Sequence, residues 1–502
     1  MQKCCSGIFV VIPGYIALSS RQSITAREPK TIKRYLTLTL APSGVDRWFV
    51  QYDTNAHLAP FIRIIKPIYM NKRFFTLLSL LFAVLFVSAQ NSDVEKMLKD
   101  INAVTSFEKI EKADTTRQYY LMKVNQLLDP QDPAAGTFEQ RVMLGHRGYD
   151  RPMVIVTEGY GADYAFSSPR YMEELTNIMD ANILFVEYRY FSGSMPKPCN
   201  WDYLTVANSM VDYHNIITSF KPYYSKKWAS TGISKGGSTT IFLRAYYPED
   251  LDVSVPYVGP LSCAVEDGRH ESFLEQVSTK ADRDAIRAFQ TELFERKERL
   301  MPMFDEYCLK NDLVFRVPTT TIYDLLVLEY QFSMWQWGTP TNTIPALDSD
   351  DKAIFDYFMK MCGPDYFAAG SNIESFFVQA VKDFGYYGYN IEPFHKYVNA
   401  EDVEGYLKRV LLPELFADVK FDDSNYRFVT DYYTENDPKA IMIYGEVDPW
   451  TASGVTWLRD RNKENVKIFI QPGGSHRARI LNMPEDMRNE ILEQLNEWME
   501  YK

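Results

Sequence analysis

The chain has 502 residues, a formal net charge of −12, 46% hydrophobic residues and 15% aromatic residues. This length is ample for a large core, and the acidic balance argues against a nucleic-acid partner, because phosphate binding needs a basic patch. Residues 1–89 are nevertheless rich in Lys and Arg, whereas the rest of the chain is strongly acidic. This contrast indicates that the first residues are not part of the fold.

Residues 70–89 have the pattern of a signal peptide. Lys72 and Arg73 precede an apolar run at 74–87, and small residues end at Ala89. A membrane anchor is the alternative, but the run falls short of the ~20 residues that a span needs. A signal peptide begins a chain, so residues 1–69 are expected to come from an over-extended gene start, or else to be a disordered leader. The sequence therefore predicts export to the periplasm or beyond, with cleavage near Ala89 and no stable membrane insertion.

Four cysteines follow the predicted cleavage site: Cys199, Cys263, Cys308 and Cys362. In an exported protein this even count is compatible with two disulfides, in any of three pairings. Four reduced, buried thiols are the alternative. The wide spacing fits no zinc motif, so no metal site is expected.

Strands and helices alternate from about residue 138. Short apolar runs predict strands at 152–160, 182–190, 228–233, 252–258, 440–444 and 466–470, and helical spacing predicts helices at 203–220 and 239–247, with a last helix near the end of the chain. This alternation predicts a parallel sheet covered on both faces. The pattern is interrupted at 265–439, where Ile286, Phe289, Leu293 and Leu300 indicate a charged amphipathic helix. We expect a sheet domain in two parts, 90–264 and 440–502, with a helical cap between them.

A nucleophile elbow is predicted around Ser234. The sequence at 232–236 is Gly-Ile-Ser-Lys-Gly, after an apolar strand and before a helix. A serine on such a tight strand-to-helix turn is exposed for attack, and small flanking residues let the turn close. A strand–turn–helix connection with an incidental serine is the alternative.

An elbow serine requires an acid and then a histidine later in the chain. Asp448 follows the strand at 440–444, and His476 follows the strand at 466–470 in a glycine-rich loop. Glu446 is the competing acid. His476 would accept the Ser234 proton, and Asp448 would fix the imidazole tautomer.

The oxyanion of such a reaction needs two backbone N–H donors. The residue after the nucleophile, Lys235, is the expected source of one. The loop after the strand that ends at Glu158 is the expected source of the other, with Tyr160 preferred. A plain glycine turn is the alternative for this loop.

Five segments together resemble one known family. They read TGISKGGST, YGEVDPW and GGSHRARI around Ser234, Asp448 and His476, with VEYRYFSGS and TEGYGADY earlier. They are similar to the secreted prolyl tripeptidyl and tetrapeptidyl aminopeptidases, which are akin to lysosomal Pro-X carboxypeptidases and dipeptidyl peptidases. The resemblance spans about 137–502. It implies an α/β-hydrolase fold with a mostly parallel sheet and a large helical cap, peptide substrates cleaved after proline near a free N-terminus, and no metal or organic cofactor.

Residues for substrate recognition are expected in the cap and at the ends of the strands. An apolar proline pocket could draw on the cap aromatics Trp335, Trp337, Tyr386 and Tyr387, which could equally be ordinary cap packing. A free N-terminus carries an α-ammonium, for which a carboxylate is the usual partner. Glu187 is our first candidate, because its strand precedes the elbow strand, with Glu158 and Glu329 next. Structural pairing of Glu187 with Arg189 or another cation is the alternative.

Two rival functions use the same residues or fold. A secreted esterase or lipase would use the same three catalytic residues. A non-catalytic binding protein with a hydrolase fold would not need them. Comparing the hydrolysis of a proline amide with that of a short-chain ester distinguishes a peptidase from an esterase. Chemical labelling of the serine distinguishes an enzyme from a binding protein.

Overall fold

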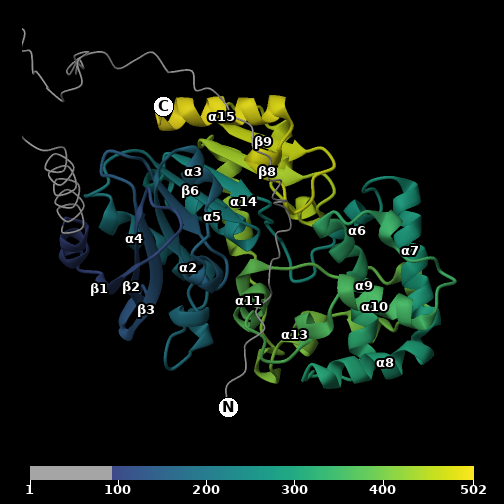
Figure 1. Cartoon of the computed structure of the whole chain (residues 1–502). Helices are drawn as coiled ribbons and strands as arrows, with labels where there is room; N and C mark the ends of the chain where they lie inside the picture. Colours follow the sequence, from purple (N-terminus) through teal and green to yellow (C-terminus); the bar gives the residue numbers. More distant parts are fainter. Residues whose placement is uncertain (1–92, 502) are drawn as a thin grey trace, which may run out of the picture. The chain divides into compact units, whose positions relative to one another are not determined.

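The computed structural model of the protein describes residues 93–501, so the predicted leader and signal peptide lie outside the described residues. A nine-stranded sheet runs through this part of the chain in the order β1-β2-β3-β5-β4-β6-β7-β8-β9 (Figure 1). Its strands are β1 (Val104–Ile110), β2 (Gln118–Asp129), β3 (Asp132–His146), β4 (Met153–Thr157), β5 (Asn182–Val186), β6 (Trp228–Ile233), β7 (Val253–Tyr257), β8 (Ala440–Gly445) and β9 (Val466–Gln471).

The six strands from β4 to β9 pair in parallel, and β1, β2 and β3 add an antiparallel edge that joins β5. Every residue of β4, β5 and β7 is buried, as expected for parallel strands that helices cover on both sides. The predicted fold class, an α/β-hydrolase with a mostly parallel sheet, is confirmed.

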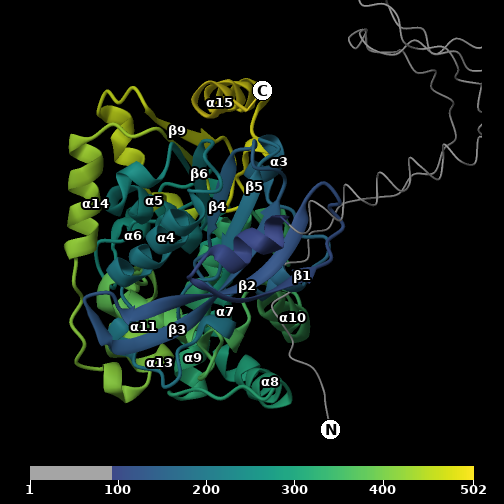
Figure 2. The same cartoon turned by 90° about the vertical axis from the view of Figure 1, so that its left-hand side faces the viewer.

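Side chains alternate between two cores on opposite faces of the sheet. Ile155 packs with α4 (Val206–Phe220) and α5 (Lys235–Tyr246), while its neighbour Val154 packs with α3 (Glu174–Ile178) and α15 (Glu485–Met499). Figure 2 shows α5 and α14 (Ser424–Glu435) across the sheet from α3. The central parallel strands are therefore closed to water on both faces, and their carboxyl edge is where side chains can act.

A helical insertion follows β7. It includes α6 (Arg269–Leu274), α7 (Lys280–Glu295), α8 (Lys297–Lys310), α9 (Thr319–Trp337), α10 (Asp351–Met361), α11 (Glu374–Gln379) and α13 (Tyr406–Leu411) (Figure 1). The single amphipathic helix expected through Ile286 and Leu300 is two helices, because the chain turns at Arg296 between α7 and α8. The last helix of the predicted cap range, α14, packs on α5, where the Tyr433 hydroxyl donates to the carbonyl of Ile241.

Two features differ from the sequence interpretation. No strand was predicted before residue 152, yet β1, β2 and β3 form a long antiparallel edge. Their residues are partly exposed, so the alternation of apolar and polar residues is a weak signal. All four cysteines are free thiols, so the expectation of two disulfides is wrong.

Across residues 93–501, no helix has both the length and the apolar character needed to cross a membrane.

A buried ion pair provides a test of this architecture. Arg189 donates to both oxygens of Asp212 on α4, at 2.6 and 2.8 Å. The two side chains are buried, at 0% and 2% exposed. Asp212→Ala leaves a buried guanidinium unpaired, so we expect the free energy of unfolding to fall by about 3–5 kcal/mol.

Urea unfolding of the purified variant measures this loss. Asp284→Ala is the control, because it removes only an exposed pair with Lys280 and should change stability by less than about 1 kcal/mol. Equal effects of the two substitutions would contradict the buried pairing.

Candidate active site

Ser234 lies on a strained turn between β6 and α5. Its φ of 59° and ψ of −123° are unusual for a residue with a side chain. The turn is anchored on both sides, since the Ser234 N–H donates to the Tyr257 carbonyl at 2.9 Å and the Ser234 carbonyl accepts from Ser238 N–H at 2.9 Å. The strand–turn–helix context that the elbow hypothesis requires is therefore present.

Glycines are needed on both sides of this turn. A Cβ at Gly232 would collide with the carbonyl of Gly236, and one at Gly237 would lie 2.5 Å from the Tyr257 carbonyl oxygen. The strand and the helix approach so closely that no side chain fits between them. Ser234 itself is partly accessible, and the preceding Ile233 is 46% exposed.

Asp448 and His476 meet at the carboxyl edge of the sheet, after β8 and β9. The Nδ1 atom of His476 lies 2.7 Å from Oδ2 of Asp448, and Asp448 is fully buried. Within residues 93–501, the other ring nitrogen, Nε2, is buried and has no hydrogen-bond partner. The carboxylate thus orients the imidazole through Nδ1 and leaves Nε2 available for a proton.

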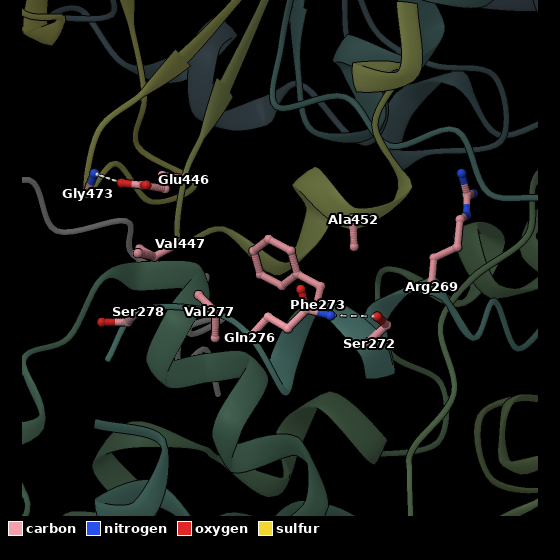
Figure 3. A pocket seen from close by; sticks show the side chains of 10 residues that line it. All are labelled: Arg269, Ser272, Phe273, Gln276, Val277, Ser278, Glu446, Val447, Ala452 and Gly473. Atoms are coloured by element: carbon pink, nitrogen blue, oxygen red, sulfur yellow. Dashed lines mark hydrogen bonds between the residues drawn. The ribbon is translucent and has the colours of Figure 1, made fainter. Parts of the chain in front are cut away.

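Glu446, the competing acid, is engaged elsewhere. Its Oε2 accepts from the N–H of Gly473 at 2.6 Å, and both residues line a cavity of about 670 Å³ (Figure 3). This cavity lies against the loops that carry Asp448 and His476, but neither residue lines it, nor does Ser234. The geometry therefore favours Asp448 as the partner of His476.

The loop after β4 abuts the start of α5. A Cβ on Gly159 would lie 2.6 Å from Cβ of Lys235 and 2.8 Å from the backbone nitrogen of Gly236. The N–H groups of Gly159 and Tyr160 donate to Oε1 of Glu158, at 3.1 and 3.2 Å. The two predicted oxyanion donors, on Lys235 and Tyr160, thus belong to adjoining segments, and the second is bonded to Glu158 in this structure.

The side chain of Lys235 has a position that sequence reasoning missed. Its Nζ donates to the Gly159 carbonyl at 2.7 Å and lies 3.4 Å from the ring centroid of Tyr188. Burial lowers the pKa of Lys235 well below the usual lysine range, against the opposing charges of Glu158 and Asp383. A lysine inside an elbow motif that starts a buried helix is the signal that could have revealed it.

Glu187, our first candidate for contact with the substrate, is a structural residue. It is fully buried, and its carboxylate accepts from Arg141 Nε at 2.8 Å, Ala162 N–H at 2.9 Å and the Ser194 hydroxyl at 2.7 Å. The strand position was predicted, but the salt bridge from β3 was not visible in the sequence. Glu187 has no surface left for a ligand, and Arg141, not Arg189, is its cation.

The other two carboxylate candidates keep exposed surface. Glu158 accepts the Tyr164 hydroxyl at 2.6 Å, and burial raises the pKa of Glu158. Glu329 on α9 accepts the hydroxyls of Tyr387 and Tyr389 at 2.7 and 2.8 Å. Burial raises the pKa of Glu329 to about 7, although both hydrogen bonds act in the opposite direction.

The predicted aromatic residues divide by exposure. Trp335, Tyr386 and Tyr387 are buried, at 6%, 8% and 1% exposed, whereas Trp337 is 41% exposed. The Trp337 ring is perpendicular to the ring of His476, with centroids 6.2 Å apart. Trp450, which the sequence analysis did not single out, lies 6.3 Å from His476 on the chain segment just after Asp448.

Residues 88–501 match the family described as PS-10 peptidase S37. The chain belongs to the S37 peptidase family. It is 27% identical over 430 residues to the prolyl tri/tetrapeptidyl aminopeptidase of Streptomyces mobaraensis, with 82% of this chain and 86% of the relative covered. The family resemblance seen in the motifs is confirmed, and the chain is a serine peptidase by family.

The solved structures that match this chain have a lower sequence identity to it than this relative has. A proline iminopeptidase of Mycobacterium smegmatis matches at 12% identity and a TM-score of 0.36, covering 78% of this chain and 98% of its own. The esterase Pf2001 of Pyrococcus furiosus matches at 14% identity and a TM-score of 0.34, covering 80% of this chain and 93% of the esterase. Within residues 93–501, no group of three or more His, Cys, Asp or Glu side chains is placed to hold a metal ion.

The contact between Gly159 and α5 can be tested directly. Gly159→Ala adds a methyl group where only 2.6 Å separates it from Lys235 Cβ, so the loop must move away from the elbow. We expect peptidase kcat to fall by at least about 10-fold, because a displaced oxyanion donor costs that much or more. Steady-state kinetics on a peptide substrate measure the loss.

Gly268→Ala is the matched control. A Cβ there would approach only Glu271 Oε1, at 4.0 Å, so its kinetics should resemble those of the unaltered chain. An unchanged kcat in Gly159→Ala would mean that this loop does not need its present position for the reaction.

Proposed function

We propose that this S37 peptidase is an exported enzyme that releases short N-terminal peptides by cleavage after proline, with Ser234 as nucleophile, His476 as base and Asp448 as acid. The observation that carries the proposal is the 2.7 Å contact between His476 Nδ1 and Asp448 Oδ2. It leaves Nε2 as the nitrogen able to accept a proton from the serine of the elbow.

The proposed reaction proceeds through an acyl-enzyme. Ser234 attacks the carbonyl carbon of the scissile bond while His476 takes the hydroxyl proton. The imidazolium, held in place by Asp448, then protonates the departing amine. Water, deprotonated by the same imidazole, attacks the ester and releases the short peptide. Apo structures often lack the hydrogen bond between nucleophile and base, which tightens only with substrate bound.

The tetrahedral oxyanion would bind between two backbone donors. Lys235 N–H is the first N–H of α5, at a helix end where N–H groups lack partners within the helix. Tyr160 N–H belongs to the planar peptide whose carbonyl, on Gly159, accepts from Lys235 Nζ. Lys235 would thus supply one donor and orient the other. Tyr160 must exchange its bond to Glu158 for one to the oxyanion.

Cleavage after proline and release of three or four residues rest on the relative's name, prolyl tri/tetrapeptidyl aminopeptidase. The exposed Trp337 ring beside His476 supports this preference, because it offers apolar surface to a proline ring at the reaction centre. A secreted esterase remains the alternative, since the same three residues hydrolyse esters.

Export is a separate part of the proposal and rests on the sequence at 70–89. Removal of the signal peptide near Ala89 should leave a mature protein that begins near Gln90. N-terminal sequencing of the native exported protein measures this directly. Detection of residues 1–69 in the exported form would refute the assignment.

A digest of a mixed peptide library, followed by mass spectrometry, tests the proposed specificity. We expect cuts after proline at the third or fourth residue from free N-termini, and slower hydrolysis of short-chain esters than of matched proline amides. Cuts distributed through internal sequence would contradict the aminopeptidase assignment, and a preference for esters would favour the rival function.

Single substitutions test the three proposed catalytic residues. Ser234→Ala should lower kcat by about 10⁴-fold or more with little change in folding, and Asp448→Asn should also be severely impaired, because it supports the wrong imidazole tautomer. Glu446→Gln is the control and should retain most activity. If Glu446→Gln is crippled and Asp448→Asn is not, the acid is misassigned.

A further inference from the structure

Glu329 is a carboxylate for which the described part of the chain supplies no cation. Its Oε2 accepts the hydroxyls of Tyr387 and Tyr389, and across residues 93–501 no Lys, Arg or His forms an ion pair with it. Both other candidates have a positive charge nearby: Glu187 pairs with Arg141, and Glu158 lies in the field of Lys235. A carboxylate in so enclosed a place is costly without a counter-charge. A cationic ligand group would supply what the chain lacks.

Glu329 is partly exposed on α9. Its neighbours on either side, Leu328 and Tyr330, are fully buried. Among the described residues, no donor contacts its Oε1. One oxygen is therefore held by two phenols, and the other is free to accept from a ligand.

Aromatic rings connect Glu329 to the proposed catalytic centre. Tyr387, which donates to Glu329, has its ring centroid 5.0 Å from that of Trp450, and Trp450 lies 6.3 Å from the ring of His476. These ring contacts link the base to the carboxylate through the interior, since Tyr387 is 1% and Trp450 8% exposed. A short peptide bound between His476 and Glu329 would have its reacting carbonyl at one end and its first residue at the other.

Helix α9 sets the distance between the base and Glu329. Its last turn touches the loop of the base, since the Gln336 carbonyl accepts the N–H of His476 at 2.9 Å. Glu329 lies seven residues earlier, on nearly the same helix face, so about 10 Å of helix rise separates the two positions. An extended peptide covers about 3.3 Å per residue, and three residues therefore span the same length.

We propose that Glu329, with the hydroxyl oxygens of Tyr387 and Tyr389, binds the α-ammonium group of the peptide substrate, and that α9 thereby measures a tripeptide from the N-terminus to the cleaved bond. This inference rests on the proposed function and adds to it the residue that recognises the end of the chain. An acetylated N-terminus has no charge to offer, and a two-residue segment is too short to reach.

The raised pKa of Glu329, about 7 in the free protein, agrees with this role. Burial among apolar and aromatic groups disfavours the carboxylate, and an ammonium beside it reverses that preference. The tyrosine hydroxyls can turn to accept from the ammonium once the charged pair has formed.

Binding to an inactive variant tests the proposal without requiring turnover. In Ser234→Ala, isothermal calorimetry would compare a hexapeptide that has proline at its third position, with a free and with an acetylated N-terminus. We expect the free form to bind about 10- to 100-fold more tightly, as for one charge-assisted contact. Adding Glu329→Gln should bring the ratio of dissociation constants close to 1. Glu401→Gln, an exposed cap carboxylate, should leave the ratio unchanged.

Both dissociation constants of a ratio are measured on the same variant. A lower fraction of folded protein therefore affects both constants alike and leaves their ratio unchanged. Tyr389→Phe gives a second, milder variant, for which we expect a partial loss of the ratio. With proline moved to the second position, the free peptide should bind more weakly.

Several results would overturn the proposal: a ratio that persists in Glu329→Gln, a ratio near 1 in the parent, no binding of either peptide, or a collapse caused by Glu158→Gln instead. Failure of the proposed function would give a different result, because the unaltered enzyme would then cut no bond after proline in the same peptides.

Discussion

The close approach of β6 and α5 is the constraint on which the site depends. The helix begins directly above the strand because Gly232, Gly236 and Gly237 present no side chains to the neighbouring backbone. Ser234 lies between this strand and helix at a positive φ of 59°. The Gly159 loop packs against Lys235 at the start of the same helix, so the proposed nucleophile and both proposed oxyanion donors share one packed junction.

The helical insertion contacts the loop that carries the proposed base. At the end of α9, the Gln336 carbonyl accepts the N–H of His476, and a Cβ on Gly338 would lie 3.0 Å from Cβ of Ser475. Free carbonyls at a helix C-terminus need partners, and here the loop of His476 provides one. A change in the position of α9 would therefore move both His476 and Glu329, the proposed partner of the substrate N-terminus.

The sequence was sufficient to predict the central sheet and the pairing of Asp448 with His476, because continuous apolar strands and glycine turns are local signals. It could not predict the antiparallel edge, where β1 and β2 are partly exposed and their pattern is weak. Glu187 was misjudged because its partner, Arg141, lies 46 residues away in the chain. The same limit applies to Glu329, whose tyrosine partners are brought close only by the folded cap.

The account depends most on Ser234 being the nucleophile. A fluorophosphonate probe reacts with an activated serine, so labelling of the native protein followed by peptide mapping tests this claim most directly. We predict one modified residue, Ser234, with labelling lost in Asp448→Asn at matched protein concentration. Labelling at another serine, or none in a correctly folded protein, would contradict it.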